Sequence, residues 1–174
     1  MEGRRMDFTN LLFSPNGRIG QKEYWVGIMI LILGNILAGM IPILGTLLWL
    51  GLIYVGVCVY GKRLHDIGKT AWIHALVWGV SIALTVLAFA FAGGSLLAAG
   101  LNNNEVDAAA ILAASGSLLL FTGLGSLIWL GYTIWLGVIA GEAGSNRFGQ
   151  PPVRTISSEP VDSTPPGGNE PPAA

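Results

Sequence analysis

The sequence predicts an all-α membrane protein with four transmembrane helices in a compact bundle and with both termini in the cytoplasm. Of its 174 residues, 52% are hydrophobic and only 11% are charged, whereas a soluble domain carries about 25% charged residues. Residues 24–61, 70–104 and 108–141 contain no Asp, Glu, Lys or Arg. Because a charge at the centre of a membrane helix costs roughly 2.5–3.5 kcal/mol on insertion scales, such long uncharged runs indicate helices within a lipid bilayer.

The first uncharged run, 24–61, is too long to cross a membrane once. As one straight helix it would be about 57 Å long at 1.5 Å per residue, and the hydrocarbon core of a bilayer is about 30 Å thick. Gly39 and Pro42 interrupt the run, since glycine loosens the backbone and proline removes a hydrogen-bond donor. We therefore predict two spans, about 24–40 and 43–60, joined by a tight turn.

Two further spans are predicted at about 70–91 and 118–140. The last uncharged run is also longer than one crossing requires. Residues 108–117, at its start, are compatible with an extension of the fourth helix, an interfacial helix or a re-entrant piece. The sequence leaves the structure of 93–117 open.

The basic residues determine the orientation. With four spans, all nine Lys and Arg residues fall on one side of the membrane, and the other side carries only Glu105 and Asp107. Cytoplasmic loops of membrane proteins carry an excess of Lys and Arg. We therefore expect a multi-pass protein with both termini in the cytoplasm.

Polar segments flank the predicted transmembrane domain, 24–149. Residues 1–23 form a cytoplasmic N-terminal segment, in which Phe8 and residues 11–13 predict a short helix on the membrane surface. Residues 150–174 form a cytoplasmic tail that contains seven of the nine prolines. Because a Pro-rich polar segment cannot bury a core, we expect the tail to be disordered.

The polar segments beside the uncharged runs meet on the cytoplasmic side in this topology, and they supply the candidate binding residues. We expect a cytoplasmic polar cluster formed by Arg18, Lys22, Arg63, His65, Asp66, Lys69, Asn146 and Arg147. Basic pockets on this side of a bundle can bind anionic lipid headgroups or a phosphate-bearing ligand, although the same residues can also simply anchor and orient the helices. We expect Asp66 to pair with Arg63 or Arg18. His65 should pack or hydrogen-bond against another segment.

No residue pattern indicates a catalytic, metal or cofactor site, and we expect none of the three. Adjacent residues on a helix do not face each other, so His65 and Asp66 are not expected to form a catalytic pair. His65 and His74 lack the further clustered ligands of a zinc site. The net charge of −1 gives no indication of a nucleic-acid partner.

Two features lie within the predicted spans. Asn35 is the most polar residue of the first span, and we expect it to hydrogen-bond a neighbouring helix. An aromatic belt at the cytoplasmic interface is predicted from Tyr24, Trp25, Tyr60 and Trp72.

Three motifs occur in order along the chain: Gly17-Arg18-Ile19-Gly20-Gln21-Lys22-Glu23-Tyr24-Trp25, Arg63-Leu64-His65-Asp66-Ile67-Gly68-Lys69, and Gly144-Ser145-Asn146-Arg147-Phe148-Gly149. Together they resemble the signatures of the domain of unknown function 805 family, over about residues 8–152. The resemblance implies a small protein of the bacterial inner (plasma) membrane with about four spans. The family has no established biochemical activity, so the resemblance implies a fold and a location but no reaction.

We therefore expect a non-enzymatic integral membrane protein of unknown biochemical role. Its cytoplasmic polar cluster would bind membrane lipids, anionic ones in particular, or a protein partner such as a second copy of the chain. Two alternatives stay open. One is an enzyme that acts on lipid or isoprenoid phosphates with Asp66 and His65, and the other is a small-solute channel or carrier with a path past Asn35.

Overall fold

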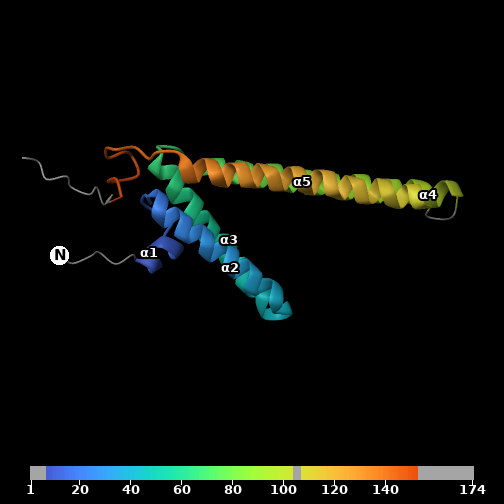
Figure 1. The fold of residues 1–174 in the computed structure, drawn as a ribbon, viewed down its shortest axis with the longest axis horizontal. Helices are drawn as coiled ribbons and strands as arrows, with labels where there is room; N and C mark the ends of the chain where they lie inside the picture. The colour runs from blue at the N-terminus through green and yellow to red at the C-terminus, as the bar shows by residue number, and fades with distance from the viewer. Residues whose placement is uncertain (1–6, 104–106, 153–174) are drawn as a thin grey trace, which may run out of the picture.

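The computed structural model describes residues 7–103 and 107–152, and these residues are all-α (Figure 1). They form five helices: α1 Phe8–Phe13, α2 Gln21–Met40, α3 Pro42–Asp66, α4 Trp72–Asn103 and α5 Ala108–Val138. The described residues contain no β-strand, only an isolated bridge between Asn146 and Gly149. The predicted helical class is confirmed. From residue 153 onward the predicted tail lies outside the described residues.

Four of the helices, α2 to α5, are long and apolar enough to cross a membrane. The chain is therefore a multi-pass membrane protein with four candidate spans, as the uncharged runs predict. The first run folds back where the sequence is interrupted: Ile41 takes an extended conformation, and Pro42 occupies the first turn of α3. Proline suits that position because the first helical amides have no acceptor within the helix.

The second pair of spanning helices is longer than the sequence analysis predicts. α4 continues past residue 91 to its end at Asn103, and residues 108–117 extend the fourth spanning helix. Asp107 caps α5, since its Oδ1 accepts a hydrogen bond from the Ala110 amide at 2.8 Å. At 1.5 Å per residue, α4 is about 48 Å long, which exceeds the roughly 30 Å hydrocarbon core.

The spans form two helical hairpins that diverge. Figure 1 shows α2 beside α3 and α4 beside α5, with the two pairs meeting at one end and separating toward the other. We call the shared end the closed end; the first described residues and the segment after α5 both lie there (Figure 1). The expected compact bundle is not what the structure contains, because the residues that pack one hairpin on the other are concentrated at this end. They include Tyr24, Tyr60, Tyr132 and Leu136.

The divergence agrees with the difference in helix length. α2, with 20 residues, is about 30 Å long and matches one hydrocarbon core. A helix longer than that thickness fits a bilayer by tilting. Figure 1 shows α4 and α5 inclined to α2 and α3, which is compatible with hairpins of unequal length in one membrane.

The short helix α1 is present, as predicted, and is tied to α3. The Lys62 ammonium group donates a hydrogen bond to the Leu11 carbonyl at 2.8 Å and another to the Asn10 carbonyl. The Tyr54 hydroxyl donates to the Phe13 carbonyl at 3.0 Å. These donors bind carbonyls of the last turn of α1, one of which, that of Asn10, also accepts from the Ser14 amide. A cation there suits the helix dipole.

Candidate functional site

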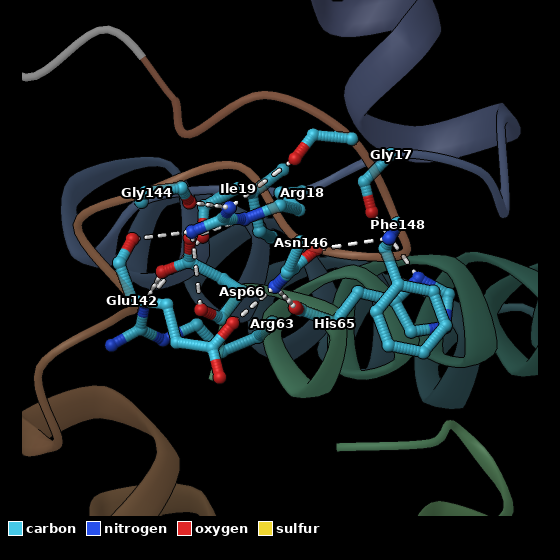
Figure 2. Close-up of polar contacts among 12 residues, drawn as sticks. Gly17, Arg18, Ile19, Arg63, His65, Asp66, Glu142, Gly144, Asn146 and Phe148 are labelled. Atoms are coloured by element: carbon cyan, nitrogen blue, oxygen red, sulfur yellow. Dashed lines mark hydrogen bonds and ion pairs between the residues drawn. The ribbon is translucent and has the colours of Figure 1, made fainter. Parts of the chain in front are cut away.

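Asp66, the last residue of α3, lies at the centre of a buried ion-pair network at the closed end (Figure 2). Its Oδ1 accepts hydrogen bonds from Arg18 Nε at 3.1 Å and Nη2 at 3.0 Å. Its Oδ2 accepts one from Arg63 Nη1 at 2.5 Å. All three side chains are fully buried. We call these three residues the arginine clamp; it holds two positive charges and one negative charge.

The rest of the Arg18 guanidinium group binds the segment that follows α5. Nη2 donates to the Glu142 carbonyl at 2.6 Å, and Nη1 donates to the carbonyls of Gly144 at 2.7 Å and Gly149 at 3.3 Å. A guanidinium group has five N–H donors, and each nitrogen of Arg18 has acceptors for all of its hydrogens. Arg18 therefore joins the chain before α2 to the chain after α5.

Arg63 makes a second set of bonds, to the end of α5 and to the segment before α2. Its Nε donates to the Leu136 carbonyl at 2.8 Å, its Nη1 to the Ile19 carbonyl at 3.5 Å, and its Nη2 to the Ile139 carbonyl. Buried charges are tolerated when they are paired and hydrogen-bonded. The clamp meets this requirement and fixes the relative positions of four segments of the chain.

Beside the clamp, Asn146 and Phe148 pack on His65 (Figure 2). Asn146 Nδ2 donates to the His65 carbonyl at 2.9 Å and to Glu142 Oε2 at 2.6 Å. The Phe148 ring stacks on the imidazole with 3.9 Å between ring centroids and an interplanar angle of 8°. His65 Nδ1 lies 3.2 Å from the Gly17 carbonyl, so Nδ1 carries the hydrogen.

The structure brings five predicted residues together directly: Arg18, Arg63, His65, Asp66 and Asn146. Arg147 adjoins them, because its guanidinium carbon lies 4.7 Å from the centroid of the Phe148 ring. Lys22 and Lys69 are exposed, as is Arg147, and neither lysine ammonium group makes a hydrogen bond or an ion pair with a described residue. The predicted cluster therefore divides into a buried clamp, with His65 and Asn146 beside it, and an outer set of three exposed cations.

His65 and Asp66 do not form a pair. The Asp66 carboxylate faces Arg18 and Arg63, and the His65 ring faces Gly17 and Phe148. The two predictions for these residues, an arginine partner for Asp66 and a contact with another segment for His65, are confirmed. Within the described ranges, no three His, Cys, Asp or Glu side chains are grouped as a metal ion would require.

Two residues of the site escaped the sequence analysis: Glu142, which packs against Gly68, and Gly141, which packs against Asp66. The Glu142 side chain packs against Gly68, which has a positive φ of 70°, and a β-carbon there would overlap its carboxylate. Gly141 lies against Asp66 so closely that a β-carbon would overlap Oδ2. Glycine is the residue that permits such close approach, so these two glycines were the available signal.

Next to the clamp, five rings pack together between the two hairpins. We call them the aromatic layer; they belong to Tyr24, Tyr60, His74, Trp129 and Tyr132. Tyr60 stacks on His74, with 4.6 Å between centroids, and on Tyr132, with 5.5 Å. Trp129 and Tyr24 meet the Tyr60 ring edge to face. The predicted aromatic belt is therefore wrong for Tyr24 and Tyr60, which are buried because both hairpins pack around them.

The expectation for Asn35 is also wrong. Its Nδ2 donates to the Leu31 carbonyl of its own helix at 2.8 Å and not to a neighbouring helix. The divergence of the hairpins leaves the side chain exposed beside a hollow between them.

Comparison with known proteins adds a family. The sequence model of the family described as "Protein of unknown function (DUF805)" matches residues 12–150. The match covers α2 to α5 and the whole of the clamp. Comparison with curated proteins and with solved structures produced no match.

Proposed function

The chain belongs to the DUF805 family of proteins of unknown function, and on that premise we propose that it is a non-enzymatic, lipid-binding protein of the bacterial inner membrane. Both termini lie in the cytoplasm, so the closed end is the cytoplasmic end. There the outer cations Lys22, Lys69 and Arg147 bind anionic lipid headgroups. The arginine clamp holds the segments that carry these cations and does not itself contact lipid.

The observation that carries this proposal is the division of the cations into two sets. Every N–H group of Arg18 already has an acceptor within the protein. Arg63 is fully buried, so neither guanidinium group is offered to a headgroup. Lys22, Lys69 and Arg147 are exposed. Exposed cations next to a membrane surface attract anionic lipids.

The outer cations belong to segments that the clamp ties together. Lys22 lies in the first turn of α2, and its neighbour Gln21 donates to the Val138 carbonyl at 2.9 Å. The Lys69 amide donates to the Leu64 carbonyl at 2.8 Å. Arg147 packs on Phe148, which packs on His65. All three cations are thus held at the closed end, where they are exposed to anionic headgroups.

A non-enzymatic role is supported by the arrangement of His65 and Asp66. An enzyme acting on lipid phosphates would need a base within hydrogen-bond reach of a reacting group. The Asp66 carboxylate is surrounded by two guanidinium groups instead. The His65 ring is covered on one face by Phe148.

The test is lipid retention measured by native mass spectrometry. The protein is released from nanodiscs that contain equal amounts of phosphatidylglycerol and phosphatidylcholine. The triple variant Lys22→Gln, Lys69→Gln, Arg147→Gln is expected to lose its preference for phosphatidylglycerol, by roughly fivefold in affinity for each cation removed. The control removes the same number of charges from Arg4, Arg5 and Arg154. Equal phosphatidylglycerol retention by wild type and the Lys22/Lys69/Arg147 variant would contradict the proposal.

A further inference from the structure

The hollow between the diverging hairpins is a groove at membrane depth. It has a volume of about 490 Å³, and side chains from all four candidate spans line it. Most of this lining is apolar or aromatic, with Ile32, Ile53, Trp49, Trp78 and Trp129 among its residues. Pockets that hold small ligands have volumes of about 300–1,000 Å³. We call this hollow the membrane groove.

The aromatic layer closes the groove toward the closed end. Tyr60, His74 and Trp129 belong both to the layer and to the groove lining. The His74 ring is satisfied within the protein, since its Nε2 accepts from Trp78 Nε1 at 3.2 Å and its Nδ1 lies 3.4 Å from the Tyr132 hydroxyl. The inner end of the groove therefore suits an apolar group.

The other end of the groove carries an amide group. Asn35 lies in the groove lining, about 7.5 Å from the end of α2 that is remote from the clamp, at 1.5 Å per residue. One of its N–H donors is used within α2. Its Oδ1 and its second N–H have no partner among the described residues. Polar groups at membrane depth are costly unless they are hydrogen-bonded, so this position calls for a polar partner.

We propose that the membrane groove binds one lipid of the leaflet remote from the clamp. The acyl chain lies in the groove with its end against the aromatic layer, and the ester or headgroup region hydrogen-bonds Asn35. The apolar inner end of the groove suits the end of an acyl chain, and the Asn35 amide at the other end suits a polar ester or headgroup. A lipid of the remote leaflet has this orientation, since its headgroup faces the remote surface and its acyl chain points toward the clamp. This site is separate from the headgroup site at Lys22, Lys69 and Arg147, because the aromatic layer and the clamp lie between them.

Two glycines of α3 allow a matched test. Gly56 lines the groove and Gly51 does not. A β-carbon added at either position meets no atom within 4 Å, so a side chain can begin at either position without a clash. Gly56→Phe fills the groove, and Gly51→Phe adds the same ring outside it.

The probe is dioleoyl phosphatidylcholine, a lipid without net charge, retained by the full-length protein after release from nanodiscs and counted by native mass spectrometry. Wild type and Gly51→Phe are expected to retain one lipid, and Gly56→Phe is expected to lose it. Asn35→Leu should weaken retention roughly fivefold, about the effect of one hydrogen bond in a membrane. Circular dichroism and gel filtration establish that each variant is folded.

The outcomes separate this site from the cytoplasmic one. The triple variant Lys22→Gln, Lys69→Gln, Arg147→Gln is expected to retain phosphatidylcholine as wild type does. Equal retention by Gly56→Phe and wild type would overturn the groove proposal, and so would an equal loss in Gly51→Phe. A lipid-free wild-type dimer would also overturn it, since a second copy of the chain would then occupy the groove.

Discussion

The two ends of the spanning region differ in how their polar groups are hydrogen-bonded. At the closed end, the charged side chains of Arg18, Arg63 and Asp66 are buried, and the arginine donors are directed at Asp66 and at carbonyls from distant parts of the chain. At the remote end, the hairpins separate, the surface is apolar, and Asn35 has unused hydrogen-bonding capacity. The arginine clamp is complete without a ligand, and the remote end is not.

This difference shows where stability and binding should be sought. The arginine clamp contains the residues that look most like a binding site in the sequence, yet its polar groups are already occupied by the protein. The membrane groove carries no motif. Substitutions in the arginine clamp should therefore change stability, whereas substitutions in the groove should change lipid retention.

The largest effect is expected for Asp66→Asn. The substitution removes the negative charge between two buried guanidinium groups, and breaking a buried ion pair from one side costs about 3–5 kcal/mol. The variant should unfold at a much lower temperature than wild type in the same detergent, as followed by circular dichroism. Glu142→Gln is the control, because it neutralises an exposed carboxylate and keeps an oxygen for Asn146. Equal melting temperatures for Asp66→Asn and wild type would mean that the clamp does not stabilise the fold.

Much of the closed end follows from the sequence. A carboxylate beside an arginine at the edge of an uncharged run has to be paired when it is buried, which is why the Asp66 partners are predictable. The number of spans follows from the cost of charge in a membrane. The break at Gly39 and Pro42 follows from backbone chemistry.

The rest depends on tertiary geometry. The bonds from Arg18 to the carbonyls of Glu142, Gly144 and Gly149 require the path of the chain after α5, which composition does not encode. Tyr24 and Tyr60 look like interfacial anchors in the sequence, and only the packing of both hairpins places them in the aromatic layer. The extra length of α4 was not predicted because the span was placed by the thickness of the hydrocarbon core, although the uncharged run 70–104 ends beside the end of the helix at Asn103.

A smaller effect is expected for Gly141→Ala, which tests how closely the clamp is packed. The new methyl group would overlap Asp66 Oδ2, and adding a methyl group to a well-packed site costs about 1–3 kcal/mol. Gly144→Ala is the matched control, since a β-carbon there meets nothing within 4 Å. Thermal unfolding should separate the two variants. If both melt like wild type, the segment after α5 yields easily and the closed end is less rigid than its hydrogen bonds indicate.

The smallest effect is expected for Phe148→Leu, which tests the edge of the closed end. The substitution removes the ring that stacks on His65 and supports Arg147, and such aromatic contacts contribute about 0.5–1.5 kcal/mol. Phe89→Leu, at an exposed position on α4, is the control for the loss of a ring. Hydrogen exchange at the amides of Asn146 and Gly149, which bond to each other's carbonyls, should accelerate in Phe148→Leu and not in Phe89→Leu.

Because Arg147 would lose its support in Phe148→Leu, retention of phosphatidylglycerol should weaken while retention of phosphatidylcholine stays unchanged. Unchanged exchange together with reduced phosphatidylglycerol retention would mean that Phe148 itself contacts the lipid, and the division between a structural core and an outer binding set would then have to include this ring.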